Sequence, residues 1–159
     1  MKEPSTPDPL DRTDQRILRT LQADGRISNA DLAQAVNLSP ATCHRRTRHL
    51  IDTGHIKGFH AEIAPDKVDR GALVMVGVVL DRSTPESFAA FEAAIVTLPF
   101  ILDCHLVAGD FDYFLKVRVS DIADFRRLHG EKLIALPGVR QTRTFFVMKE
   151  VIDNAPLDF

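Results

Sequence analysis

Two stretches with helical character are separated by only three residues, and this spacing constrains the fold more than any other feature of the sequence. The first stretch begins at Ser28, with Asp31 three residues later, which is the pattern of a capping box. The second begins at Ser39-Pro40, where serine can cap the helix and proline at the first helical position leaves no donor unsatisfied. Asn37 closes the earlier helix, so a tight turn joins the two. Such a pair predicts a helix-turn-helix.

A third helical stretch lies just before this pair. Asp11 is positioned to cap it, and Asp14 in its first turn suits the positive end of the helix dipole. Apolar residues then recur at helical spacing up to Asp24-Gly25, where glycine is expected to end the helix in a left-handed conformation. Three short helices with narrow apolar faces predict a winged helix-turn-helix DNA-binding domain over residues 10–62.

The distribution of charge supports this prediction better than the total does. The chain of 159 residues has a net charge of −2, which alone argues against a general nucleic-acid binder. Residues 1–60 hold nine Lys/Arg against seven Asp/Glu, whereas residues 61–159 hold eleven against fifteen. Within the first part, residues 39–58 carry four Lys/Arg and one Asp, a net charge of +3. Basic charge focused on one short element is what a compact DNA-reading surface needs.

The helix after the tight turn is the candidate for reading DNA. It has small or polar residues at its N-terminal end and cations along its outward face, as a helix in the major groove requires. Thr42 and Arg45 are predicted to contact base edges, and Arg48 and His49 to contact phosphates. Arg46 lies nearer the buried side, where a structural role is the alternative. The start of the preceding helix is expected to offer its N-terminus to a phosphate. The complete set of predicted DNA-binding residues is Ser28, Asn29, Ser39, Pro40, Ala41, Thr42, His44, Arg45, Arg46, Arg48 and His49.

Segments outside regular structure mark the domain boundaries. Residues 54–63 place scattered apolar side chains among polar ones and predict either a hairpin or an extended linker. The polar residues 63–71 are predicted to link two domains. A Pro-rich, disordered tail is predicted at residues 1–9, and a C-terminal tail at residues 152–159.

Residues 72–151 carry strand and helix patterns in the order β-α-β-β-α-β. The strands are predicted at residues 72–80, 100–107, 113–119 and 139–148. Thr84-Pro85 begins the first helix, and Ser120 is predicted to cap the second, which carries the apolar residues Ile122, Phe125, Leu128 and Leu133. The order predicts an α+β, ferredoxin-like domain, in which both helices cover one face of a four-stranded antiparallel sheet. Apolar residues on the other face predict dimerisation through the sheet.

Several ordered motifs resemble one known family. Leu10–Leu18, Asp24–Asn29 and Leu38–Pro40 resemble the N-terminal domain of the Lrp/AsnC family, the feast/famine transcriptional regulators. Cys104–Tyr113 resembles the signature of that family's effector domain, and Leu136–Val139, followed by Thr142-Arg143-Thr144, resembles the pattern at its last strand. The resemblance covers residues 10 to 151 without an obvious gap.

The resemblance implies a sequence-specific regulator of transcription that binds double-stranded DNA and responds to a small effector, an amino acid. The resemblance also implies dimers that are joined through their C-terminal sheets and often assemble into octamers, with the effector bound between subunits. Carried over by position, the effector-binding residues are Gly109, Asp110, Asp112, Tyr113, Ile122, Phe145, Phe146 and Val147. Backbone N–H groups of a turn suit an α-carboxylate, and Asp112 or Asp110 suits an α-ammonium group. An ordinary hairpin turn is the alternative explanation of Gly109-Asp110.

Other functions receive less support from the residues. An enzyme is disfavoured because there is no nucleophile motif, no carboxylate pair with a supporting base and no Gly-rich phosphate loop; His105 beside Cys104 has no third partner nearby in sequence. A metal site is disfavoured because the adjacent Cys43 and His44 point to different faces of a helix. A ligand-binding or enzymatic ferredoxin-like oligomer without a DNA role is the alternative function, and the helix-turn-helix opposes it.

The sequence also bears on the setting of the protein. No apolar run approaches the length of a membrane span, and the first nine residues lack the apolar core of a signal peptide. The two cysteines lie in different predicted domains, so no disulfide is expected. The expected setting is the cytoplasm, in association with the nucleoid. No cofactor and no metal are expected, only the small-molecule effector.

Overall fold

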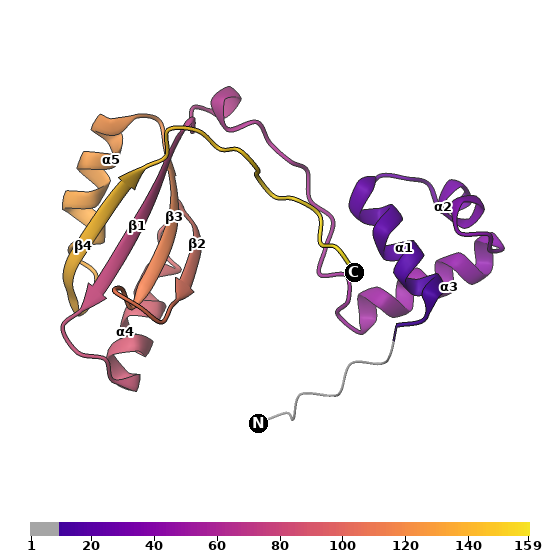
Figure 1. The fold of residues 1–159 in the computed structure, drawn as a ribbon, viewed down its shortest axis with the longest axis horizontal. Coiled ribbons are helices and arrows are strands. Elements are labelled where there is room, and N and C mark those ends of the chain that lie inside the picture. Colours follow the sequence, from indigo (N-terminus) through magenta and orange to yellow (C-terminus); the bar gives the residue numbers. More distant parts are fainter. Residues whose placement is uncertain (1–9) are drawn as a thin grey trace. The chain divides into compact units, whose positions relative to one another are not determined.

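A computed structural model describes residues 10–159, so the tail predicted at residues 1–9 lies outside the described residues. The chain forms two compact units (Figure 1). The first contains the residues up to Glu62 together with Ile152–Phe159, and the second contains Ile63–Val151. Across the described range, no helix is both long and apolar enough to span a membrane.

Three helices build the first unit: α1 (Arg12–Ala23), α2 (Asn29–Ala35) and α3 (Pro40–Asp52). Each begins at a predicted capping residue, whose side-chain oxygen accepts the N–H of the residue three positions later. The N···O distances are 2.7 Å at Asp11, 3.1 Å at Ser28 and 3.3 Å at Ser39. The caps satisfy donors that have no partner within the helix, which fixes where each helix starts. The helices share one small core, made by Ile17, Leu32, Ala33, Val36, Cys43 and Leu50.

The helices of the first unit end in two different ways, with a left-handed residue or with a side-chain hydrogen bond that closes the turn. Asn37, between α2 and α3, adopts a left-handed φ of 56°, and Gly54 after α3 has a φ of 78°. The expected left-handed glycine after α1 is wrong, because Gly25 does not adopt that conformation. Instead Oδ1 of Asp24 accepts the N–H of Arg26 at 2.9 Å, so the aspartate side chain closes the turn.

The segment after α3 is the extended linker rather than the hairpin. Residues 55–64 contain no strand. Ile56 packs against the core of the first unit, and its N–H donates to the carbonyl of Leu50 at 3.0 Å. Within the predicted linker, Pro65–Val68 forms a 3-10 turn.

The second unit is a four-stranded antiparallel sheet with two helices. Its elements are β1 (Ala72–Leu80), α4 (Pro85–Ile95), β2 (Ile101–Leu106), β3 (Tyr113–Val119), α5 (Ile122–Leu128) and β4 (Val139–Phe146). The strand order is β2-β3-β1-β4, which confirms the ferredoxin-like prediction. Phe91 of α4 and Phe125 of α5 join the same buried cluster as Val74 and Val76 of β1, so both helices cover one face of the sheet (Figure 1).

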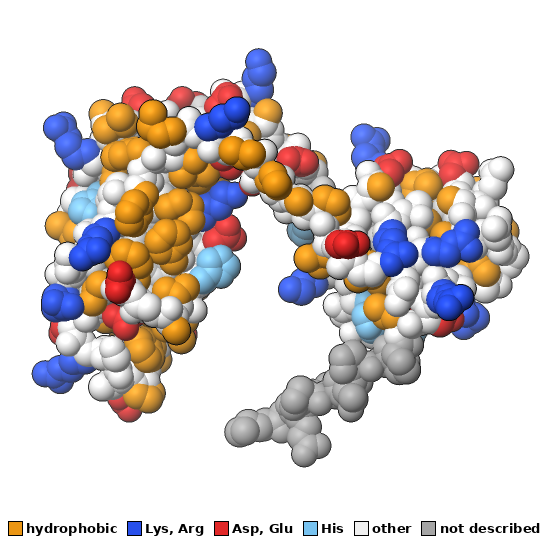
Figure 2. Space-filling model, viewed as in Figure 1, with side chains coloured by type: hydrophobic (Ala, Val, Ile, Leu, Met, Phe, Trp, Pro, Cys, Tyr) orange, Lys and Arg blue, Asp and Glu red, His pale blue; other side chains and the backbone are white. Residues whose placement is uncertain are grey.

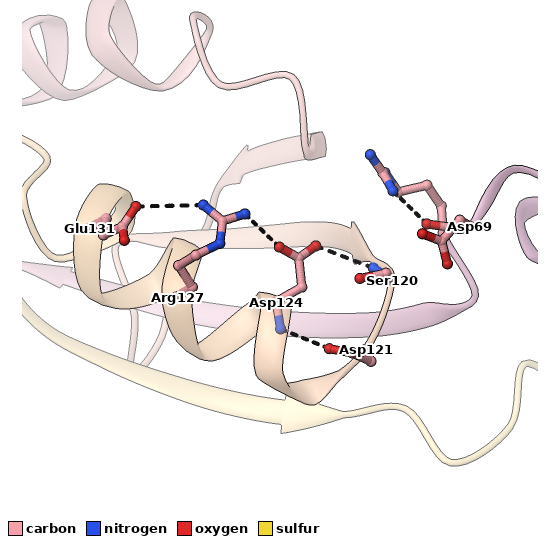
Figure 3. Close-up of polar contacts among 7 residues, drawn as sticks. Asp69, Ser120, Asp121, Asp124, Arg127 and Glu131 are labelled. Atoms are coloured by element: carbon pink, nitrogen blue, oxygen red, sulfur yellow. Dashed lines mark hydrogen bonds and ion pairs between the residues drawn. The ribbon is translucent and has the colours of Figure 1, made fainter.

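The start of α5 differs from the prediction. Asp121, not Ser120, caps the helix, because Oδ1 of Asp121 accepts the N–H of Asp124 at 2.8 Å (Figure 3). The Ser120 N–H instead donates to Oδ2 of Asp124. Ile122 therefore becomes the first residue of the helix, and it is 66% exposed. A π-helical turn, His129–Leu133, follows α5.

The face of the sheet opposite the helices is apolar and open. Residues of β1 alternate, so Val74, Val76 and Val78 are buried under the helices while Met75 faces the other side. On that open face the rings of Phe111, Phe114 and Phe145 form a cluster, with centroids 5.9 to 6.3 Å apart. Glycine at position 77 allows the Phe111 ring to lie close to the β1 backbone, since a Cβ there would be 2.6 Å from that ring. Figure 2 shows hydrophobic side chains gathered over the strands.

Candidate functional site

The outward face of α3 is the candidate DNA-reading surface. Cys43 and Leu50 turn into the core, which directs the opposite side of the helix to solvent. The exposed residues are Pro40, Ala41, His44, Arg45, Arg48 and His49. The first turn therefore presents small side chains, and the following turns present cations. This is the arrangement that lets a helix approach the major groove closely.

The cations of α3 differ in how firmly they are held. Arg45 makes no ion pair with the described residues. Arg48 pairs with Asp52 at 3.2 Å, but both side chains are more than half exposed. Exposed pairs of this kind contribute little, so a phosphate can replace the carboxylate. Both arginines can therefore bind DNA.

Arg46 is held inside the first unit. Its Nη1 donates to Oδ2 of Asp11 at 2.7 Å and to Oδ1 of Asp14 at 2.9 Å, and both carboxylates belong to the start of α1. The N–H of Asp14, which donates to the Asp11 carboxylate, and the Arg46 guanidinium lower the pKa of Asp11. The same carboxylates raise the pKa of Arg46. Of the two roles open to Arg46, these contacts support the structural one.

The remaining candidates lie where α2 and α3 begin. The Asn29 side chain donates to the carbonyl of Pro40 at 2.9 Å, which ties the start of α2 to the first turn of α3. The hydroxyl of Ser28 donates to Asp31 at 2.7 Å, and the hydroxyl of Ser39 donates to Thr42 at 2.9 Å. The predicted residues of the two helix starts are thus close together. Thr42 is half-buried, while Ser28, Asn29 and Ser39 are exposed.

The β2–β3 hairpin contains four of the candidate effector residues. Gly109 has a φ of 153°, and both it and Asp110 are exposed. Asp112 is already engaged, since Oδ2 accepts the N–H of Leu80 at 2.8 Å and Oδ1 accepts the hydroxyl of Ser83 at 3.2 Å. The Asp112 carboxylate therefore pins the hairpin to the end of β1.

Tyr113 points away from the open face. Its side chain is buried beneath α4, and its hydroxyl donates to Oε1 of Glu92 at 2.7 Å. Burial, followed by the bond to Glu92, raises the pKa of Tyr113 well above its usual value. Tyr113 can support the hairpin from the helix-covered face of the sheet, but its hydroxyl is directed to α4.

Of the other candidate effector residues, Ile122, Phe146 and Val147 lie at the opposite end of the sheet, whereas Phe145 contacts Phe111 of the hairpin. Ile122 is on the first turn of α5, and the N–H of Val147 donates to the carbonyl of Leu73 at 3.0 Å. Phe146 packs edge-on against Phe125 at 5.5 Å, and Phe145 joins the cluster on the open face. The seven residues of β3 span about 20 Å between the hairpin and α5 (Figure 1). One subunit therefore divides the predicted effector residues into two groups.

Sequence reasoning missed residues near both groups. Phe111 and Phe114 were not among the candidates, although Phe114 alternates with the buried Tyr113 and Leu115 and could have been assigned to the open face. The Arg143 guanidinium lies 5.8 Å from the centre of the Phe111 ring. The buried Arg118 pairs with Glu150, a contact between residues too distant in sequence for pattern reading.

An open cleft of about 680 Å³ lies beside α5, and its cations are largely paired. Arg127 bonds to Asp124 at 2.7 Å and approaches Glu131 at 3.5 Å (Figure 3). The paired arginine leaves the cleft without a strong charge preference. Among residues 10–159, no group of three or more His, Cys, Asp or Glu side chains is arranged to hold a metal ion.

Comparison with known proteins identifies both units. Residues 10–57 match the model of a winged helix-turn-helix DNA-binding domain, and residues 73–157 match that of the Lrp/AsnC ligand binding domain. The chain is 50% identical over 142 residues to the leucine-responsive regulatory protein of Salmonella typhimurium, covering 89% of this chain and 87% of that protein. The corresponding protein of Escherichia coli K12 is 49% identical over the same length and coverage.

Solved structures agree with this assignment. A transcriptional regulator from Neisseria meningitidis in complex with L-Met superposes with a TM-score of 0.89 at 31% identity, over 94% of this chain and 97% of that one. An AsnC family regulator from Agrobacterium tumefaciens gives 0.88 at 30% identity, over the same shares of the two chains. This chain contains a helix-turn-helix unit and an Lrp/AsnC ligand-binding unit, and its relatives are of the same kind. The chain therefore belongs to the Lrp/AsnC family of transcriptional regulators.

Proposed function

We propose that this regulator binds specific double-stranded DNA as a homodimer through α3, and that an amino acid bound between subunits modulates the binding. The single observation that carries the DNA half is the outward face of α3, where Arg45 and Arg48 extend beyond a first turn of small residues. DNA as the partner makes the nucleoid, in the cytoplasm, the proposed place of action.

Dimerisation supplies the second reading helix. The Phe111, Phe114 and Phe145 cluster on the open sheet face is an apolar surface of the kind that marks protein–protein contact. A twofold axis through such a face would make each cluster pack against its copy. Two copies of α3 then favour pseudo-palindromic sites with half-sites one helical turn apart. Assembly beyond the dimer, up to an octamer, is a further step of the same proposal.

The division of the candidate effector residues supports a site between subunits. Gly109 and Asp110 lie at one end of the sheet, while Ile122 and Val147 lie at the other. A single small molecule cannot touch both groups within one subunit, so a site that uses both needs two subunits. The relatives include proteins named for a response to leucine and a regulator in complex with L-Met, which supports an amino acid as the effector here.

The hairpin chemistry suits a zwitterion. Gly109 and Asp110 are exposed, and the backbone N–H groups of such a turn can bind an α-carboxylate. Asp110 has no partner among the described residues, whereas both oxygens of Asp112 are engaged. We therefore assign the α-ammonium group to Asp110 and a supporting role to Asp112. The relatives are DNA-binding regulators, and we propose no catalytic activity and no cofactor.

A binding titration tests the proposal. The probe is DNA from the protein's own upstream region, titrated at two salt concentrations, with and without a pool of the twenty amino acids. We expect tighter binding than to a random fragment, a steep loss of affinity with salt and a change on adding the pool. Binding equal to that of the random fragment on this DNA, and no enrichment in a genome-wide selection, would contradict the proposal.

A further inference from the structure

The first unit has an open groove beside α1, and residues from the end of the sequence form part of its lining. The groove, of about 380 Å³, lies between the C-terminal half of α1 and the segment that follows α3. Leu18 and Leu21 form one wall, and Ile56 and Phe59 form the other. Leu157 and Phe159 lie against these side chains, although they are more than 130 residues away from α1 in sequence. The groove and all the residues that line it belong to the first unit.

Gln22 holds this segment by its backbone. The N–H of Leu157 donates to Oε1 of Gln22 at 2.9 Å, and Nε2 of Gln22 donates to the carbonyl of Leu157 at 3.0 Å. One side-chain amide thus satisfies both polar groups of one residue, as a neighbouring strand would. The guanidinium of Arg19 also lies over the Phe159 ring, 5.5 Å from its centre. These contacts fix both the position and the register of the segment.

The same stretch of chain is anchored in the second unit before it reaches the groove. Val147, directly after β4, bonds to Leu73, and Glu150 pairs with the buried Arg118. Phe145 to Val147 are candidate effector residues, so only a short stretch separates them from Leu157. A change in the end of β4 therefore has a short covalent route to the groove.

From the groove, α1 leads to the reading helix. Its C-terminal half carries Gln22, and its N-terminal end carries Asp11 and Asp14, which hold Arg46 of α3. A helix transmits a shift along its length because its backbone hydrogen bonds make it stiff. The contact with Leu157 and the contact with Arg46 therefore both lie on α1.

We propose that residues 155–159 are a latch that docks against α1 of the same chain, beside this groove, and that this latch carries the effector-bound state of β4 to α3. The docking half stands on the contacts of Gln22 and Arg19 alone. The regulatory half rests on the proposed function. With the latch closed, the first unit has two connections to the second instead of one.

Hydrogen–deuterium exchange on the full chain tests the docking without DNA. The amide of Leu157 should be protected in the wild type and should exchange roughly threefold to tenfold faster in Gln22→Ala, since a net hydrogen bond contributes about 0.5–1.5 kcal/mol. Gln34→Ala on α2, an exposed glutamine of the same unit, is the matched control and should leave the rate unchanged. Free exchange of Leu157 in the wild type overturns the proposal.

Cross-linking distinguishes docking within a chain from docking between copies. Cysteines replace Ala23 and Asp158, the exposed neighbours of Gln22 and Leu157, in a Cys104→Ser background, which leaves only the buried Cys43, and a short bis-maleimide joins them. Within-chain docking gives a cross-linked species of single-chain mass on denaturing gels. A covalent dimer, formed at concentrations where wild-type controls give none, overturns the within-chain form.

The regulatory half is tested by DNA titration with and without the amino-acid pool. Gln22→Ala should keep its affinity in the absence of the pool within about threefold, but the change caused by the pool should shrink at least threefold. Gln34→Ala should keep the full change. A full response in Gln22→Ala, with its latch shown to be open by exchange, overturns the coupling. If the wild type does not bind DNA specifically, the proposed function fails, while the exchange result still decides the docking.

Discussion

At the scale of single residues, Arg45 and Arg46 are neighbours with different surroundings. Arg45 extends to solvent from α3, whereas Arg46 bonds to two carboxylates of α1. The affinity for DNA depends on salt because each phosphate contact releases counterions. The two side chains should therefore differ in their effect on the salt dependence.

Arg45→Ala should weaken DNA binding by about 1–3 kcal/mol and reduce the slope of log affinity against log salt by roughly 0.9. Arg46→Ala should leave the slope unchanged and instead lower the free energy of unfolding by about 1 kcal/mol, since its ion pairs are partly exposed. Titrations at four salt concentrations, with thermal unfolding alongside, measure both quantities. A reduced slope in Arg46→Ala would show that Arg46 contacts phosphate.

Asp110 and Asp112 of the β2–β3 hairpin should also differ, one in its effect on the effector response and the other in its effect on stability. Asp112→Ala removes the acceptor for Leu80 and Ser83, so it should lower the free energy of unfolding by about 1–2 kcal/mol. Asp110→Ala should change stability by less than about 0.5 kcal/mol, as exposed substitutions do, yet abolish the response to the amino-acid pool. Denaturant unfolding and DNA titration separate the two effects. An intact response in Asp110→Ala would remove Asp110 from the effector site.

At the scale of elements, the contact between α1 and α3 should depend on pH. The N–H of Asp14 and the Arg46 guanidinium lower the pKa of Asp11 in the folded state. A carboxylate with a lowered folded pKa stabilises the fold above its unfolded pKa, and this contribution is lost as pH falls through the folded pKa.

Thermal unfolding between pH 7 and pH 2 should therefore show a loss of stability below the ordinary pKa of aspartate. Asp11→Asn keeps a good capping residue but removes the charge, so it should reduce the pH dependence in that range. Asp66→Asn, an exposed aspartate for which no ion pair is found in residues 10–159, serves as the control. Equal pH profiles for Asp11→Asn and the wild type would show that the Arg46 contact does not depend on the Asp11 charge.

Local signals explain why the element starts were predictable. Asp11, Ser28 and Ser39 were identified as caps because capping involves residues only three positions apart. The same logic chose Ser120 at α5, one residue before Asp121, which caps the helix in the structure. Gly25 was misread since Asp24 closes that turn with its side chain.

At the scale of the whole molecule, the open sheet face should control assembly. Phe145 contacts both other rings of the aromatic cluster and is 46% exposed. Phe145→Asp places a charge where two such faces would meet, and it should weaken self-association by about 2 kcal/mol or more. Val96→Asp, at an 80% exposed position directly after α4, is the matched control. Sedimentation velocity measures the mass, and an unchanged mass for Phe145→Asp would exclude this face as the interface.

Contacts between distant residues set the limit of sequence reading at this scale. The strand patterns predicted the sheet and its open face, but the separation of Gly109 from Ile122 follows from the register of β3 and β1. The orientation of Tyr113 toward Glu92 depends on the packing of α4. Gln22 and Leu157 meet across 135 positions, and neither residue type signals such a contact.

The first unit is built from two separate parts of the sequence, so it cannot be completed until the end of the chain has been synthesised. Domains tend to fold in the order in which they leave the ribosome, and α1 to α3 emerge first. Residues 152–159, which complete this unit, are translated only after the whole of the second unit. A nascent chain can thus form its three helices and their caps early, yet Gln22 acquires its partner last. The DNA-binding unit reaches its final form only in a chain that already carries its ligand-binding unit.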